Sequence, residues 1–513
     1  MPARKSHTLI KSALVLGFAT VITRMIGFGR EIVLAAFYGA GNVSDAFILA
    51  FSIPDVLLFF VSFSATSGFI PTYQRVFDKT VFTRNIMTCL IIFGLLFSAV
   101  FTMIPGALVR VFAFFINEET FEIAVFFVRY MVWSAVFILL TAIYKAKLEI
   151  KGSFFSAGTQ SFWGNIIIIA GIIAGATSGY NILVALAPVA GNALCVLVLA
   201  SRCKKHGYSY RPYLNIKSPE LRHMLLLIGP MFISTASNEL YMIINRNFAA
   251  SLPAGAISAL NYSAKVQTLL AALIGSSVFT VLFPHMSKIA AVGDRKGVMD
   301  ILSRSIVYIM AIVLPIGVGV VILAQPIVRV FFERGAFTSG DTFLTASCLR
   351  MYAFVIITHS INPLITRAFY AIQNAKAPAY ASLATLLASV GLNFLLITPL
   401  GVRGLALSAS FANMLATIIL LILIRRKLGN LGLWSKLPEF AKMLAATGIM
   451  GVGVWLASGA LPLMSATALQ SLLLCAMLAF CAAAVYAALL LLLRSKTAFE
   501  AVGMVVGVIK KKR

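Results

Sequence analysis

Apolar segments recur along the whole chain and alternate with short polar segments. Each apolar segment has about 20 residues or more, the length that an α-helix needs to cross the hydrocarbon core of a bilayer. Fourteen such helices are predicted, over residues 12–37, 44–70, 82–108, 121–144, 155–177, 180–201, 223–250, 257–287, 300–323, 342–371, 378–398, 402–424, 439–460 and 466–493. We therefore expect an all-α integral membrane protein with about 14 transmembrane helices.

Positive charge in the loops supports this helix count. Loops that follow even-numbered helices carry Lys and Arg, as at Lys145, Lys147 and Lys151, whereas the loops over 178–180 and 252–256 carry none. Cytoplasmic loops of membrane proteins hold an excess of these residues, and one missing helix would move every later loop to the wrong side. The alternation therefore places both termini in the cytoplasm.

A basic segment over 202–222 divides the chain after the sixth predicted helix. We expect an N-terminal lobe over 1–201, a cytoplasmic linker over 202–222, a C-terminal lobe over 223–427, and helices 13 and 14 with a basic tail over 428–513. Each lobe opens with a charged helix, a turn of small residues and a second helix, a similarity found in transporters with internal repeats. The expected architecture is two pseudo-symmetric six-helix lobes plus two C-terminal helices.

The composition agrees with a lipid environment and removes several classes of function. Hydrophobic residues make up 60% of the 513 residues and charged residues only 11%, against roughly a quarter charged in soluble domains. Cytoplasmic loops explain the formal net charge of +26, and no nucleic-acid-binding motif accompanies it, so no nucleic acid is expected as a partner. The chain carries no HExxH, CxxC or DxD pattern, so we predict neither an enzyme nor a bound metal or cofactor.

Ionisable residues within the apolar segments are the functional candidates, because a charge at the bilayer centre costs about 2.5–3.5 kcal/mol on insertion scales. Glu31 directly follows Arg30, and adjacent helical residues do not share a face. The candidates are the cations Arg24, Arg30, Arg246 and Lys265 and the acids Glu31, Asp45, Asp55 and Glu239.

An alternative interpretation is that these side chains reach the lipid headgroups, or form ion pairs that fix helix packing. A group of cations within the membrane instead suits a cargo with fixed negative charge. Arg offers paired donors to phosphate oxygens, and Lys offers a compact point charge. We therefore expect a lipid-linked cargo with a phosphate-bearing headgroup.

Several motifs resemble one family of membrane transporters. They lie in the order 23–31, 37–41, 44–47, 245–246, 257–262, 332–338, 367–371 and 401–406. The stretches TRMIGFGRE, FYGAG and SDAF, followed by NR, ISALNY, FERGAFT, RAFYA and GVRGLA, are similar to the MurJ/MviN family of lipid II flippases. The similarity extends over roughly the first twelve predicted helices.

The resemblance implies a multi-pass transporter of the multidrug/oligosaccharidyl-lipid/polysaccharide (MOP) superfamily in the bacterial cytoplasmic (inner) membrane, with two lobes around a cationic cavity. Its cargo would be lipid II, the undecaprenyl-diphosphate-linked peptidoglycan precursor, moved from the cytoplasmic to the outer leaflet by alternating access. Peptidoglycan biosynthesis, cell wall biogenesis and cell shape would depend on it. Lipid II, membrane lipids and cell-wall synthesis proteins are the implied partners, and a membrane potential or a cation gradient is the implied driving force.

The resemblance also implies roles for the charged residues within the membrane. Substrate binding, through the diphosphate, is expected of Arg24, Arg30 and Lys265. Gating pairs or ion coupling are expected of a second set, Asp45, Asp55, Glu239 and Arg246. The last two helices would form a groove for the lipid tail.

The chain departs from the family pattern in the second and eighth helices. After Pro54-Asp55, where the family commonly has an Arg pair and then Glu-Gly, the chain reads VLLFF over 56–60 and SFS over 62–64. One cation of the expected cavity is therefore missing from the second helix. In the eighth helix, Thr268 stands near the place of an acidic residue.

These departures keep other functions open. The first is a flippase for another undecaprenyl-linked oligosaccharide, such as an exopolysaccharide or O-antigen unit. A cation-coupled drug exporter would need a cavity rich in carboxylates and aromatic rings instead of cations. A membrane glycosyltransferase or phosphatase would need clustered carboxylates or histidines. A scaffold that transports nothing is the remaining alternative.

We predict that Arg24→Ala abolishes transport but leaves the protein folded in the membrane, because it removes a donor to the diphosphate. Complementation of a flippase-depleted strain measures transport, and the amount of protein in the membrane fraction is the control. Normal growth with this variant would argue against a substrate contact at Arg24.

Overall fold

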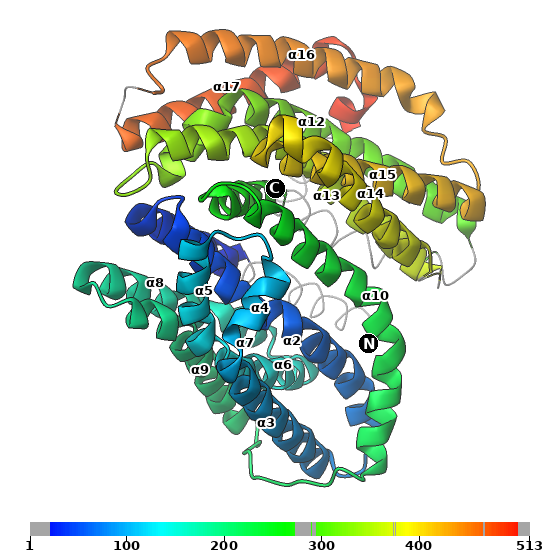
Figure 1. Cartoon of the computed structure of the whole chain (residues 1–513). Helices are drawn as coiled ribbons and strands as arrows, with labels where there is room; N and C mark the ends of the chain where they lie inside the picture. The colour runs from blue at the N-terminus through cyan, green and yellow to red at the C-terminus, as the bar shows by residue number, and fades with distance from the viewer. Residues whose placement is uncertain are drawn as a thin grey trace. The chain divides into compact units, whose positions relative to one another are not determined.

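Helices account for all the regular structure in the part of the chain that the computed structural model describes, residues 21–271, 289, 294–372, 374, 376–464 and 467–500 (Figure 1). The expected all-α class is confirmed. Ten of the described helices are long and apolar enough to cross a membrane, or eleven if one bent pair is a single span. The total of fourteen stays a prediction, because both basic termini, the start of the first predicted helix and the end of the eighth lie outside the described residues.

The chain forms two compact units. The first unit contains the residues up to Asn261 and the short segment Arg334–Thr338, and the second contains Tyr262–Glu333 and the residues from Ser339 onwards. The boundary between them falls within the helix over 256–271. The two lobes predicted from loop charge and the internal repeat stay a prediction.

The first unit begins with a helix over 21–38, drawn in blue in Figure 1. The helices that follow are α2 (Asn42–Arg75), α3 (Lys79–Met103), α4 (Pro105–Phe112), α5 (Glu118–Met131), α6 (Ser134–Ile150), α7 (Phe154–Gly158), α8 (Gln160–Ser178), α9 (Asn181–Lys205) and α10 (Pro219–Ala250). Helix α6 packs against α2, α3 and α9, so it lies inside the unit.

The second unit follows the helix over 256–271. Its further helices are α12 (Arg295–Phe332), α13 (Ser339–Ala371), α14 (Lys376–Leu400), α15 (Val402–Leu428), the short 3-10 helix η1 (Trp434–Lys436), α16 (Leu437–Ala460) and α17 (Ala468–Leu492). An apolar core joins α12, α16 and α17, with the fully buried Met443 and Ala446 on α16. The last two helices are therefore packed on α12.

Three predicted helices are each two helices in the structure. The segment over 82–108 is α3 and α4, which meet at Ile104 because Pro105 disfavours a helical conformation of the residue before it. The segment over 121–144 is α5 and α6, which are bent by 50° at their junction. The segment over 155–177 is the one-turn helix α7 and then α8. Hydropathy does not locate such breaks, because the apolar run continues across them.

The segment predicted as a cytoplasmic linker is packed against the first unit. Within it, Tyr208 is buried, and its ring centroid lies 3.5 Å from the ammonium of Lys147 on α6. Burial raises the pKa of Tyr208, so the phenol stays neutral and its ring face attracts the cation. On α3, Asn85 Oδ1 accepts a hydrogen bond from the backbone N–H of Asn215 at 2.7 Å. These contacts hold the segment in place.

Helices α8 and α9 approach each other through small residues. A Cβ added at Gly191 would lie 2.7 Å from the carbonyl oxygen of Gly164, and a Cβ added at Gly164 would lie 2.9 Å from the sulfur of Cys195. Further along, a Cβ at Gly171 would lie 2.3 Å from that of Ala187. Close packing of this kind drives helix association in membranes, where lipid removes the hydrophobic driving force. Larger side chains would push the two helices apart.

We predict that Gly191→Ala lowers the melting temperature of the detergent-solubilised protein, because the added methyl group would clash with the backbone of α8. Overpacking of this kind costs about 1–3 kcal/mol. Gly448→Ala in α16 is the matched control, because a Cβ there meets no atom within 4 Å and Ala favours helix. Equal melting temperatures for the two variants would contradict the packing role of Gly191.

Candidate functional site

A cavity of about 610 Å³ lies within the first unit. It is enclosed by the helix over 21–38 together with α2, α6, α8 and α9. Its volume is within the range of about 300–1,000 Å³ that is typical of ligand sites. Every enclosing helix contributes polar side chains to the wall: Arg30, Asp55, Ser62, Thr66, Thr141, Lys145, Glu149, Gln160, Ser161, Asn165 and Asn192. This cavity is the candidate site.

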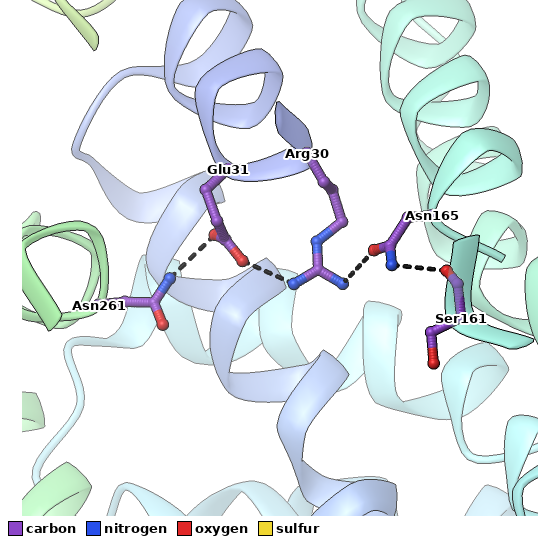
Figure 2. Close-up of polar contacts among 5 residues, drawn as sticks. All are labelled: Arg30, Glu31, Ser161, Asn165 and Asn261. Carbon is purple, nitrogen blue, oxygen red and sulfur yellow. Dashed lines mark hydrogen bonds and ion pairs between the residues drawn. The ribbon is translucent and has the colours of Figure 1, made fainter. Parts of the chain in front are cut away.

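The buried guanidinium of Arg30 is the centre of a chain of polar contacts at the cavity (Figure 2). Its Nη2 donates to Glu31 Oε1 at 2.6 Å, and its Nη1 donates to Asn165 Oδ1 at 3.2 Å. Glu31 Oε2 accepts from Asn261 Nδ2 at 2.9 Å, and Asn165 Nδ2 donates to the carbonyl oxygen of Ser161 at 2.7 Å. The chain thus links the first helix to α8 and to the helix that follows α10.

The pairing of Arg30 with Glu31 corrects the expectation that these neighbours point apart. Their backbones do point about 100° apart around the helix, but the two long side chains meet beyond the helix surface. A buried charge without a partner would cost several kcal/mol, which favours the contact. The guanidinium also lies 4.3 Å from the ring centroid of Phe51. Arg30 is therefore held on two sides, and much of its charge is balanced.

Several buried polar atoms at the cavity wall have no hydrogen-bond partner among the described residues. They are Nε of Arg30, Oγ of Ser62, Oγ1 of Thr141 and Oε1 of Gln160. Buried polar groups in proteins are almost always hydrogen-bonded, so four such atoms in residues of one cavity wall mark this wall as unusually polar. Sequence reasoning missed Thr141 and Gln160, because single polar residues are common in membrane helices.

Three of the four residues predicted for gating or ion coupling lie together in the first unit. The guanidinium of Arg246 on α10 interacts with the carboxylates of Asp55 and Glu239, and its Nη1 donates to Ser52 Oγ on α2. Asp55 also lines the cavity. Within the described ranges, no three His, Cys, Asp or Glu side chains converge as a metal site. A gating or coupling role for this cluster stays a prediction.

Asp45, the fourth residue of that set, is placed differently. Its buried carboxylate accepts the backbone N–H of Gly255 at 2.8 Å and that of Ser258 at 2.7 Å. These donors lie at the start of the helix over 256–271, where backbone N–H groups have no partner within the helix. Asp45 also lies in the first turn of α2, so the positive ends of two helices meet at its charge. The geometry makes Asp45 a helix cap.

The chain matches the lipid II flippase MurJ family over residues 34–493. It belongs to this family. A probable lipid II flippase MurJ from Rickettsia prowazekii (strain Madrid E) is 27% identical over 421 residues, which cover 79% of this chain and 82% of the relative.

Solved structures show the same fold. A lipid II flippase MurJ in an inward closed conformation matches with a TM-score of 0.77 at 24% identity, over 92% of this chain and 98% of that chain. An inward-facing multidrug resistance MATE family transporter of the MOP superfamily matches with a TM-score of 0.67 at 15% identity, over 82% of this chain and 98% of that chain. The expected superfamily fold is confirmed.

One difference between this chain and the MurJ family pattern lies on the cavity wall. In the part of α2 where an Arg pair and then Glu-Gly were expected, Phe59 and Phe63 line the cavity. Their rings are stacked, with centroids 5.8 Å apart. Helix α2 therefore presents aromatic rings to the cavity where a cation was expected.

The three cations predicted to bind the diphosphate have different surroundings. Arg30 is buried and lines the cavity, whereas Arg24 on the same helix is exposed and is not part of the wall. Six residues correspond to about 240° around a helix axis beyond one full turn, so the two arginines point in different directions. Lys265 is exposed and belongs to the second unit. Substrate contacts at Arg24 and Lys265 stay predictions.

We predict that Asp45→Ala lowers the melting temperature of the purified protein, because two buried N–H groups lose their acceptor at a cost of about 1–3 kcal/mol each. Asp45→Asn keeps one acceptor oxygen but loses the charge between two helix ends, so its melting temperature should be intermediate.

The matched control for the Asp45 variants is Asp300→Ala. The side chain of Asp300 is 59% exposed and pairs with Arg304 across one helical turn, a contact worth only about 0.3–0.5 kcal/mol. Thermal unfolding in detergent measures all three variants. A wild-type melting temperature for Asp45→Ala would rule out the capping role.

Proposed function

We propose that this chain is a lipid II flippase, which moves the undecaprenyl-diphosphate-linked peptidoglycan precursor from the cytoplasmic to the outer leaflet of the bacterial inner membrane. The match to the MurJ family over residues 34–493 carries this proposal. A second relative, from Rhizobium tropici, is 26% identical over 86% of this chain and is also named a probable lipid II flippase. The protein is thus a transporter of a lipid-linked cargo.

The chemistry of the cavity supports an anionic headgroup as cargo. A guanidinium carries its charge at every physiological pH and matches the oxygens of a phosphate. Arg30 holds such a group at the cavity wall, and its Nε has no partner among the described residues. Hydroxyl and amide side chains around the same cavity suit the sugars and peptide of a peptidoglycan precursor.

Alternating access is the mechanism that the fold supports. Multidrug transporters of the MOP superfamily with this fold have been solved in inward-facing and outward-facing conformations. A cargo headgroup bound in a cavity inside the membrane needs such a change, because it cannot cross the hydrocarbon core unaccompanied.

The driving force belongs to the same proposal. Arg246 interacts with Asp55 and Glu239 on two different helices. One cation cannot neutralise two carboxylates, so one acid of such a cluster can bind a proton or a metal cation while the other stays paired with the cation. We infer that this cluster gates the transporter or couples it to a cation gradient or the membrane potential. We also infer from the loop charges that both termini lie in the cytoplasm. Cell-wall synthesis proteins are the proposed partners, because they would supply or use the cargo.

A second cargo is favoured by one observation, the aromatic wall of α2. Phe59 and Phe63 replace charge at the cavity, and aromatic rings commonly pack against sugar rings. Another undecaprenyl-linked oligosaccharide, such as an exopolysaccharide or O-antigen unit, is therefore the alternative to lipid II.

We predict that the purified full-length protein, reconstituted in liposomes, moves labelled lipid II across the bilayer. Arg30→Ala should lower the rate about tenfold or more, the effect of losing charged hydrogen bonds worth about 1.5–3 kcal/mol. Arg30→Lys keeps the charge but lacks the planar fork that reaches both Glu31 and Asn165, so its rate should be intermediate.

Arg202→Ala is the matched control, because Arg202 is exposed at the end of α9. Its rate should equal that of the wild type, and melting temperatures show whether the Arg30 variants are folded. Liposomes that contain an undecaprenyl-diphosphate-linked oligosaccharide test the second cargo. Transport of that lipid without transport of lipid II would show that the oligosaccharide lipid is the cargo. Transport of neither lipid would refute the flippase function.

A further inference from the structure

Lys145 is a second cation, besides Arg30, at the wall of the cavity in the first unit. Sequence reasoning counted it as a loop residue, but α6 continues to Ile150 and places Lys145 on the cavity wall. The side chain is half-buried, and it forms no ion pair with a residue of the described ranges. Arg30, by contrast, is paired with Glu31 at 2.6 Å. Lys145 is therefore a cavity cation whose charge no ion pair within the described chain balances.

Hydrogen-bond donors without partners accompany Lys145. Thr141 lies one helical turn before it, so the two side chains share one face of α6. Among the described residues, the hydroxyls of Thr141 and Ser62 and the Nε of Arg30 have no hydrogen-bond partner. The three residues that carry these atoms all line the same cavity. Two cations and two hydroxyls around one cavity match the several acceptor oxygens of a phosphate.

The carboxylates of the cavity do not cancel this arrangement. Asp55 interacts with Arg246 on α10, which also interacts with Glu239, so part of the charge of Asp55 is offset there. Glu149 lies one turn beyond Lys145, on the side away from Thr141 along α6. Lys145 therefore lies in the middle of this row, one turn from the hydroxyl of Thr141 and one turn from the carboxylate of Glu149, and no ion pair joins Lys145 to Glu149 in the described residues. The carboxylate is left to accept hydrogen bonds from sugar hydroxyls or amides.

Lys145 matters because the rest of the cavity wall carries little unpaired positive charge. Phe59 and Phe63 occupy the α2 wall, and the charge of Arg30 is shared with Glu31. A diphosphate carries more negative charge than one partly neutralised guanidinium can balance. A second cation on another helix meets that need.

We propose that Lys145 binds the phosphate of the lipid-linked cargo in this cavity and supplies the positive charge that α2 lacks. The inference rests on the proposed flippase function. The ammonium is a compact charge with three donors, and Thr141 adds a hydroxyl one turn away. Arg30 adds a guanidinium at the wall from the first helix, so two helices of the unit present cations to the phosphate.

Binding of fluorescent lipid II to the full-length protein in nanodiscs tests this proposal. Lys145→Ala should weaken binding about tenfold, as expected when a charged hydrogen bond is lost. Lys145→Arg keeps the charge and should bind within about threefold of the wild type. Undecaprenol, which has no phosphate, should bind equally to the wild type and to Lys145→Ala.

Lys151→Ala is the matched control, because Lys151 is an exposed lysine at the C-terminal end of the same helix and is not part of the cavity wall. Its affinity for lipid II should be that of the wild type. If the melting temperature shows that Lys145→Ala is unfolded, Lys145→Gln replaces it, because the amide keeps a polar group without charge.

The outcomes separate this inference from the proposed function. A wild-type protein that does not bind lipid II would refute the flippase function, and the role of Lys145 with it. Binding by the wild type together with equal binding by folded Lys145→Ala or Lys145→Gln would overturn the role of Lys145 alone. An equal loss of undecaprenol binding would also overturn it, because the effect would then not depend on phosphate.

Discussion

The ion pair between Arg30 and Glu31 is the interaction on which the cavity depends. A guanidinium in an apolar interior is tolerated only when partners balance its charge and its donors. Glu31 accepts from one terminal nitrogen and Asn165 from the other, so the cation stays at the cavity wall and points in a fixed direction. The same pairing removes much of its net charge. A site for a diphosphate built around Arg30 therefore needs positive charge from another helix.

The all-α membrane fold was predictable, because the length of an apolar run is set by the thickness of the bilayer and does not depend on tertiary contacts. Helix breaks within an apolar run were harder to predict. The sequence contains the signal for one break, at Pro105, but the 50° bend between α5 and α6 has no such marker. The end of α6 was also placed too early, because Lys145 and Lys147 were taken as loop residues. A lysine within a helix is tolerated where a cavity or an aromatic ring receives its ammonium, and only tertiary structure shows that.

The candidate site was predictable in part. Arg30 stood out because a charge in an apolar run is costly, and it does line the cavity. Asp45 stood out for the same reason, but its buried carboxylate caps a helix that begins 211 residues later, at residue 256. A charged residue within an apolar segment is rare and therefore marks an important position, but the sequence does not tell whether its side chain binds a ligand or the backbone. Thr141 and Gln160 carry no charge, so nothing in the sequence distinguished them from packing residues.

The glycine contacts between α8 and α9 determine which walls of the cavity can yield. Both helices contribute to the wall, and their backbones already touch at Gly164 and Gly191. Two helices in such contact can neither move closer nor separate without losing their packing, so α8 and α9 behave as one rigid pair. Room for a bulky headgroup then has to come from the other helices that line the cavity, which are the helix over 21–38, α2 and α6.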